Sequence, residues 1–176
     1  MKKSNIALIG FMGTGKTTVG EKLAKILKMD FIELDEFIEE LAGKPIPLIF
    51  KEDGEIRFRE YEIEACKKVS IKNNVVIACG GGVVLNKINI DYLKQKGIII
   101  YLEATPVVIY ERTMIEGKEK RPLLDNPNPM KSIKDLLEFR APFYKAAAQY
   151  TINTEKDINS IINEIVEIFK KEKKNN

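Results

Sequence analysis

An octapeptide near the start of the chain constrains the fold more than any other feature. It reads Gly10-Phe11-Met12-Gly13-Thr14-Gly15-Lys16-Thr17 and matches the pattern G-x-x-x-x-G-K-[ST] in full. An apolar run at residues 6–9 precedes it, and apolar residues at helical spacing follow it over residues 18–28. This order predicts a strand, a glycine loop and a helix, with backbone N–H groups converging on the phosphates of a nucleotide.

Two side chains of this loop predict its chemistry. We expect Lys16 to reach the β- and γ-phosphates, and we expect the hydroxyl of Thr17 to bind Mg²⁺. A glycine-rich turn with a chance lysine is the alternative interpretation. The flanking strand and helix patterns favour the nucleotide site.

Composition limits the class of protein. The chain has 176 residues, of which 44% are hydrophobic and 31% charged, and these values are typical of one globular domain. The net charge of +3 is too small to indicate a nucleic-acid partner, and no segment is typical of a membrane span or a signal peptide. Cys66 and Cys79 lack metal-ligand spacing and suit a reducing compartment. We therefore expect a single-domain cytoplasmic enzyme without a nucleic-acid or membrane partner.

The chain contains no histidine. This absence excludes imidazole general-base catalysis, Ser-His-Asp nucleophiles and histidine-ligated zinc. Any proton acceptor must therefore be a carboxylate, a lysine or an oxygen of the substrate.

Apolar runs alternate with helical patterns along the chain. The runs have the length of buried strands and cover residues 5–9, 30–34, 75–79, 98–102 and 150–153. Their alternation with helices predicts an α/β fold in three layers, α/β/α, with a five-stranded parallel sheet.

Helix-start signals and two polar stretches complete the expected order. Thr105-Pro106 begins one expected helix, Ser132 with Asp135 resembles a capping pair that opens another, and residues 158–169 form a last amphipathic helix. Residues 43–54 and 116–130 fit the alternation poorly. They are either surface loops or a substrate-binding insertion and a mobile lid.

Two further motifs follow predicted strands, where ligands of open α/β sheets bind. The triplet Gly80-Gly81-Gly82 would let the backbone approach an anion and offer N–H donors, although a flexible turn is the alternative. Glu33 and Asp35 would share one side of the second strand, with one facing the metal and the other the acceptor hydroxyl. Capping of the next helix is the alternative for this pair.

Three arginines lie in distinctive local contexts. They are Arg59 in Phe58-Arg59-Glu60-Tyr61-Glu62, Arg121 in Arg121-Pro122-Leu123-Leu124, and Arg140 in Arg140-Ala141-Pro142-Phe143-Tyr144. Arginine suits bidentate binding of carboxylate or phosphate, although each of these taken singly is typical of a surface charge.

The ordered set of motifs resembles the shikimate kinases, which have a P-loop fold similar to that of nucleoside-monophosphate kinases. The resemblance runs from about residue 6 to about residue 168 and rests on the glycine loop, the acidic pair, F-R-x-x-E, the triplet, R-P-L-L and R-x-P-x-Y. It implies one kinase domain over residues 1–176, with a substrate-binding segment at about 35–63 and a lid at about 113–128. It also implies a monomer that transfers the γ-phosphate of ATP to the 3-hydroxyl of shikimate in aromatic amino-acid biosynthesis.

The same resemblance implies a role for each matching residue. Those expected to hold ATP are Gly13, Thr14, Gly15, Lys16, Thr17, Thr18 and Arg121. Those expected to hold shikimate are Asp35, Arg59, Gly80, Gly81, Gly82 and Arg140. Lys16, Asp35 and Arg121 are the expected catalytic residues, and Mg²⁺ is expected on Thr17 and, through water, on Glu33. Arg112 aligns with a second lid-side basic position, and residues 150–157 cover the region near adenine.

Two residues depart from the family pattern, and two kinds of rival remain. The family usually has Asp-x-Asp where this chain has Glu33 and Asp35, and a hydroxyl residue is common at the position of Cys79. A gluconate or nucleoside-monophosphate kinase on the same fold is one rival, but the triplet together with R-x-P-x-Y favours shikimate. A catalytically silent nucleotide-binding module is the other, and we would expect it to have lost Lys16, Asp35 or an arginine of the carboxylate site.

Overall fold

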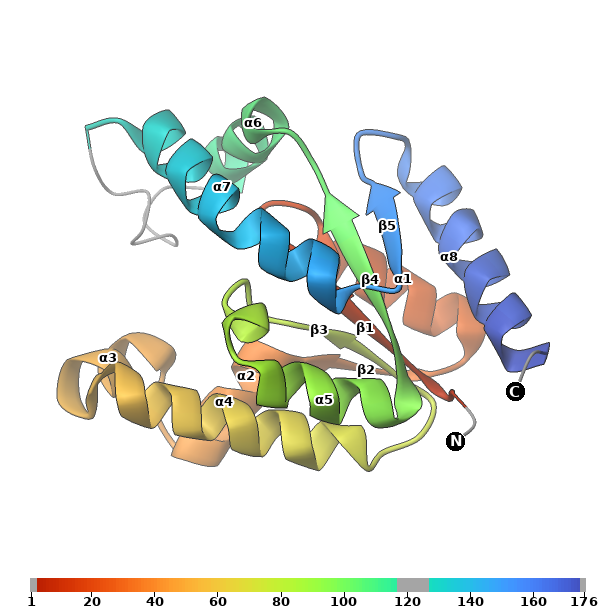
Figure 1. The fold of residues 1–176 in the computed structure, drawn as a ribbon, viewed down its shortest axis with the longest axis horizontal. Coiled ribbons are helices and arrows are strands. Elements are labelled where there is room, and N and C mark those ends of the chain that lie inside the picture. Colours follow the sequence, from red (N-terminus) through yellow and green to blue (C-terminus); the bar gives the residue numbers. More distant parts are fainter. Residues whose placement is uncertain (1–2, 117–126, 175–176) are drawn as a thin grey trace.

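The computed structural model describes residues 3–116 and 127–174. Within these residues a five-stranded parallel sheet lies between two layers of helices, in the strand order β2-β3-β1-β4-β5 (Figure 1). The strands are β1 Asn5–Ile9, β2 Asp30–Glu33, β3 Val75–Ala78, β4 Gly97–Glu103 and β5 Tyr150–Asn153. The predicted three-layer α/β fold is confirmed.

The central strand β1 is buried along its whole length, and its side chains alternate between the two helix layers. Ala7 and Ile9 belong to one apolar cluster, and Ile6 and Leu8 belong to the other. Each fully buried leucine or isoleucine of this strand stabilises the fold by about 1.5–3 kcal/mol. Two-sided burial explains why the strand is a continuous apolar run in the sequence.

Helices follow each of the strands. They are α1 Lys16–Leu27, α2 Leu34–Ala42, α3 Ile46–Glu52, α4 Gly54–Ser70, α5 Lys87–Lys96, α6 Pro106–Glu116, α7 Pro129–Ala147 and α8 Ile158–Lys174, with a short 3₁₀ turn η1 at Val83–Leu85. Apolar faces of α1 and α8 pack in one layer, and those of α4, α5 and α7 pack in the other. Among the described residues, no helix has both the length and the apolar character that a membrane crossing requires.

One predicted helix start was wrong, and one helix was not predicted. The helix expected to open at Ser132 begins earlier, at Pro129, because the side chain of Asn128 accepts a hydrogen bond from the Lys131 amide at 3.1 Å and caps it. The turn-rich stretch 43–54 contains a helix, α3, since its prolines fall before and within the first turn, where they break no helical hydrogen bond. The helix beginnings predicted at Pro106 and Ile158 are confirmed.

Candidate active site

The glycine loop joins β1 to α1 in the predicted strand–loop–helix order. Gly10 has φ of +146°, and a Cβ there would lie 2.5 Å from the carbonyl oxygen of Leu102 on β4. Glycine is therefore required at this position. Lys16 is the first residue of α1, and its ammonium donates to the carbonyl oxygens of Gly10 and Phe11 at 3.0 and 2.9 Å. These bonds hold the cation across the mouth of the loop.

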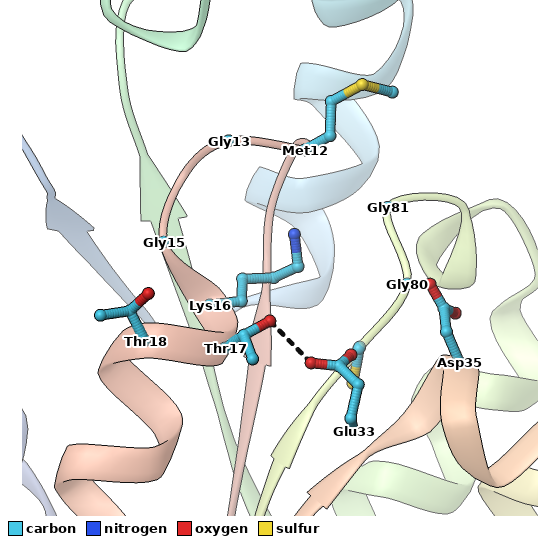
Figure 2. Close-up of a pocket in the computed structure, with 11 residues that line it drawn as sticks. Met12, Gly13, Gly15, Lys16, Thr17, Thr18, Glu33, Asp35, Gly80 and Gly81 are labelled. Atoms are coloured by element: carbon cyan, nitrogen blue, oxygen red, sulfur yellow. Dashed lines mark hydrogen bonds between the residues drawn. The ribbon is translucent and has the colours of Figure 1, made fainter. Parts of the chain in front are cut away.

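A cavity of about 110 Å³ lies between this loop, the end of β2 and the glycine triplet (Figure 2). Its lining combines residues that lie far apart in the sequence: Met12, Gly13, Gly15, Lys16, Thr17, Thr18, Glu33, Asp35, Cys79, Gly80 and Gly81. The structure thus brings together the two sequence-predicted groups, one expected to hold nucleotide phosphates and one expected to hold the acceptor.

Glu33 contacts the threonine that was predicted to bind a metal. The hydroxyl of Thr17 donates to Glu33 Oε2 at 2.7 Å (Figure 2). Burial raises the pKa of the Glu33 carboxyl, the hydrogen bond from Thr17 opposes this rise, and the charge of Asp35 adds to it. Glutamate is one methylene longer than the aspartate usual in the family. Its carboxylate nevertheless lies beside the Thr17 hydroxyl, which was predicted to bind the metal.

The expected strand alternation of Glu33 and Asp35 was wrong. The strand β2 ends at Glu33, and Asp35 lies in the first turn of α2. Both side chains nevertheless line the cavity. The chain changes from extended to helical between them, so the turn of the helix, and not the pleat of the strand, directs Asp35 toward the triplet.

Three charged side chains surround the glycine triplet. A Cβ on Gly80 would collide with the Asp35 carboxylate, and a Cβ on Gly82 would lie 2.9 Å from Arg59 Nη1. A Cβ on Gly81 would lie 3.5 Å from Arg140 Nη1. At the triplet the backbone therefore lies close to one carboxylate and two guanidinium groups, and residues without a Cβ make room for them. The interpretation as a flexible turn does not explain these close contacts.

Arg59 is held by two carboxylates on its own helix, α4. Its Nη1 lies 3.1 Å from both oxygens of Glu62, and its Nη2 lies 3.1 Å from Glu55 Oε1. The Glu62 side chain is only 2% exposed, whereas that of Glu55 is 67% exposed. Burial raises the pKa of Glu62, and the charge of Arg59 opposes that rise. The i, i+3 spacing in F-R-x-x-E is the signal that could have identified Glu62 as the buried partner of Arg59.

Tyr144 supports the triplet from α7. Its hydroxyl donates to the Gly81 carbonyl oxygen at 2.6 Å, and its ring stacks on that of Tyr101 with 5.0 Å between centroids. Burial raises the pKa of Tyr144 to about 12, so the hydroxyl keeps its proton at neutral pH. Sequence reasoning gave Tyr144 no role, although the conclusion was available from R-x-P-x-Y, which places it one helical turn after Arg140.

Arg140 lies next to Tyr144 and has spare hydrogen-bonding capacity. Its guanidinium carbon is 5.9 Å from the ring centroid of Phe11, which belongs to the glycine loop. Its Nε atom is buried and has no hydrogen-bond partner within residues 3–116 and 127–174. A buried guanidinium N–H without a partner is costly.

A second hollow of about 280 Å³ lies on the other side of the glycine loop. Arg112 and Thr154 line it, and Arg112 donates to the Thr154 hydroxyl at 3.0 Å and to the Thr154 carbonyl at 2.6 Å. The guanidinium of Arg112 is thus engaged with the segment that follows β5. Residues 150–157, expected near adenine, contribute Thr154 and Lys156 to this hollow.

Thr14, Cys79, Arg121 and the expected lid complete the set of predicted features. Thr14 is buried, and its hydroxyl donates to the Phe11 carbonyl at 2.8 Å within the loop. Cys79 lines the first cavity, and burial raises the pKa of its thiol, so it stays neutral. Arg121 and most of the lid expected at 113–128 lie outside the described residues.

Comparisons with known proteins find relatives of this chain by sequence and by fold. A family model for shikimate kinase matches residues 12–170. A shikimate kinase of Caldanaerobacter subterraneus is 46% identical over 166 residues, which cover 94% of this chain and 95% of that one. The solved shikimate kinase of Acinetobacter baumannii in complex with shikimate superposes with a TM-score of 0.88 at 37% identity, covering 97% of this chain and 95% of that one. A gluconokinase of Sinorhizobium meliloti shares the fold alone, with a TM-score of 0.61 at 16% identity over 99% of this chain and 97% of that one.

Proposed function

Because the chain belongs to the shikimate kinase family, we propose that shikimate binds where Asp35, Arg59 and Arg140 converge on the glycine triplet. The protein is an ATP-dependent phosphotransferase that transfers the γ-phosphate of ATP to the 3-hydroxyl of shikimate. The convergence of one carboxylate and two guanidinium groups on a side-chain-free backbone carries the assignment of the binding site. Its chemistry suits a ligand that has both a carboxylate and hydroxyl groups.

The nucleotide is proposed to lie along the glycine loop, with its base in the second hollow. The loop amides and Lys16 would hold the phosphates, while Thr18 and Arg112 line the hollow for the base. This arrangement directs the γ-phosphate toward the first cavity, which Asp35 also lines. Arg121 in the lid is proposed to contact the transferring phosphate, as the family resemblance implies.

The residues beside the loop fit Mg²⁺. Thr17 and Glu33 offer oxygen atoms, which this ion prefers, and Thr17 Oγ1 lies 2.7 Å from Glu33 Oε2. Within the described residues no three histidine, cysteine, aspartate or glutamate side chains form a metal cluster. Thr17 directly and Glu33 through water would therefore hold the ion together with phosphate oxygens. Bound there, Mg²⁺ would neutralise charge on the phosphates.

The chain's own residues contribute positioning and charge. Phosphoryl transfer passes through a loose transition state, so orientation of the hydroxyl and neutralisation of negative charge dominate catalysis. Asp35 would orient the 3-hydroxyl and accept its proton late, once the phosphorus–oxygen bond is forming. Lys16 and Arg121 would stabilise the charge on the phosphoryl oxygens. Because the chain has no histidine, imidazole is excluded as the proton acceptor, and Asp35 is the carboxylate proposed for that role.

ADP release measured with Mg²⁺-ATP and each of four acceptor conditions tests the function. We expect turnover with shikimate and only background with gluconate, CMP or no acceptor, and we expect EDTA to abolish it. Turnover with gluconate or CMP would overturn the pocket assignment while keeping the fold. ATP binding without turnover on any acceptor would support the silent module.

The substitution Tyr144→Phe tests the support of the triplet. It removes the hydroxyl that bonds the Gly81 carbonyl and leaves the stack on Tyr101 in place. The loss of this partly buried hydrogen bond, worth about 1 kcal/mol, should raise the shikimate KM roughly fivefold and leave the ATP KM unchanged. Tyr150→Phe is the matched control, because its hydroxyl bonds Glu172 away from the site. Equal changes in both variants would contradict the role of Tyr144.

The remaining assignments stay proposals. We propose that the acceptor-binding segment at about 35–63 comprises α2, α3 and α4 as far as residue 63, and that the lid spans about 113–128. We also propose a monomer located in the cytoplasm. Analytical ultracentrifugation with and without substrates would test the monomeric state. Cell fractionation would test the location.

A further inference from the structure

Asn89 is a fully buried polar residue of α5 that contacts the helix carrying Arg59. Its Nδ2 donates to Glu62 Oε2 at 3.0 Å and to the Val83 carbonyl oxygen at 3.2 Å. Glu62 in turn accepts the contacts from Arg59 at 3.1 Å. One buried amide thus joins α5 to the turn after the glycine triplet and to the carboxylate behind Arg59. The helices α4 and α5 lie side by side in the layer that carries these residues (Figure 1).

The chemistry of an amide suits this position because both partners are acceptors. The –NH₂ group of Asn89 has two hydrogens, and turning the amide over would bring Oδ1 against the carboxylate of Glu62. In the observed orientation Oδ1 is buried and has no hydrogen-bond partner in the described part of the chain. An apolar residue would fill the same space without this cost, so packing alone does not explain an asparagine here.

We propose that Asn89 is a positioning residue for shikimate binding, which fixes the Glu62 carboxylate and through it the guanidinium of Arg59. The inference rests on the proposed role of Arg59 in the shikimate site. The other carboxylate on Arg59 belongs to Glu55, which is largely exposed, and an exposed ion pair contributes little. The buried Glu62 is therefore the contact that sets where Arg59 points beside Gly82, and Asn89 is what prevents that carboxylate from turning away.

Asn89→Leu, which removes the donors and keeps the branching of the side chain, tests the proposal. We expect the shikimate KM to rise about tenfold with the ATP KM unchanged, because Arg59 loses its orientation and the glycine loop does not. Asn86→Ala is the matched control. Asn86 caps the same helix by accepting from the Ile88 amide at 3.0 Å, so its loss weakens α5 without touching Glu62. The control should keep the wild-type shikimate KM.

The pH dependence of the shikimate KM provides a second readout. Glu62 must be ionised to hold Arg59, so shikimate binding is lost as the pH falls through the Glu62 pKa. Burial raises that pKa, Arg59 and the Asn89 hydrogen bond oppose the rise, and the charge of Asp35 adds to it. The thiols of Cys66 and Cys79 also interact electrostatically with Glu62 and stay neutral, because burial raises the pKa of each. The acid limb should therefore move to higher pH in Asn89→Leu and stay in place in Asn86→Ala.

The outcomes separate this inference from the proposed function. If wild-type protein phosphorylates shikimate but Asn89→Leu keeps its KM and acid limb, or shifts no more than Asn86→Ala, the inference alone is overturned. If the wild type does not act on shikimate, the proposed function fails and the inference with it. If Asn89→Leu does not fold, NMR of the wild-type protein provides the test, through the signals of the Asn89 side-chain amide protons. Their signals should move when shikimate is added while those of Asn86 stay, and unmoved Asn89 signals overturn the proposal.

Discussion

Asp35→Asn should lower kcat by about 10²–10⁴-fold, the range of a general base, while the ATP dissociation constant stays within about twofold. The amide keeps the size of the side chain against Gly80 and in the cavity, so shikimate can still enter. It cannot accept the proton that the 3-hydroxyl loses as the new phosphorus–oxygen bond forms. No histidine exists in the chain to replace it.

The neighbouring Glu36 supplies the control for this prediction. It lies in the same first turn of α2 but is exposed, so Glu36→Gln removes one negative charge without touching the cavity. We expect Glu36→Gln to keep the wild-type kcat. Single-turnover measurements with saturating shikimate and ATP compare the chemical step in the two variants. Retained turnover in Asp35→Asn would show that the carboxylate only positions shikimate and that a phosphate oxygen takes the proton.

The strands and the nucleotide loop were predictable because each depends on local sequence. The strand β1 is an apolar run because both of its faces are buried, and the glycine loop needs glycine where Gly10 has φ of +146° and meets Leu102. Parallel strands also bring their carboxyl ends to one edge of the sheet, which is why the ends of β2 and β3 could be expected to share a site. Each of these constraints can therefore be recognised in the amino-acid sequence.

The supporting contacts could not be predicted because they join helices whose relative placement no local pattern encodes. Tyr144 and Gly81 are 63 positions apart, and Asn89 and Glu62 are 27 apart. The placement of Asp35 depended on where β2 ends. The predicted run covers residues 30–34, but the strand ends one residue earlier, at Glu33, so Asp35 lies in the helix α2. The helix α3 was missed because proline in a first turn and proline in a loop give similar sequence signals.

Arg140→Met should raise the shikimate KM by a factor of roughly 30 to several thousand, because losing one partner of a buried charge pair costs about 2–5 kcal/mol. The guanidinium of Arg140 lies at the glycine triplet, where a Cβ on Gly81 would be 3.5 Å from its Nη1. The ATP KM should stay within about twofold. Arg140→Lys should rescue little of the loss, since a lysine lacks the planar pair of donors that a carboxylate needs.

Lys145 on the same helix provides the control, because it is 64% exposed and pairs only loosely with Glu103 at 3.7 Å. Lys145→Met should keep both KM values. The methyl ester of shikimate then separates loss of the carboxylate contact from general disruption of the site. Wild-type protein should discriminate strongly between shikimate and its ester, and Arg140→Met should discriminate weakly, because the partner of the carboxylate is gone. Undiminished discrimination in Arg140→Met would assign the carboxylate to Arg59 alone and leave Arg140 to hold Tyr144 and the triplet in place.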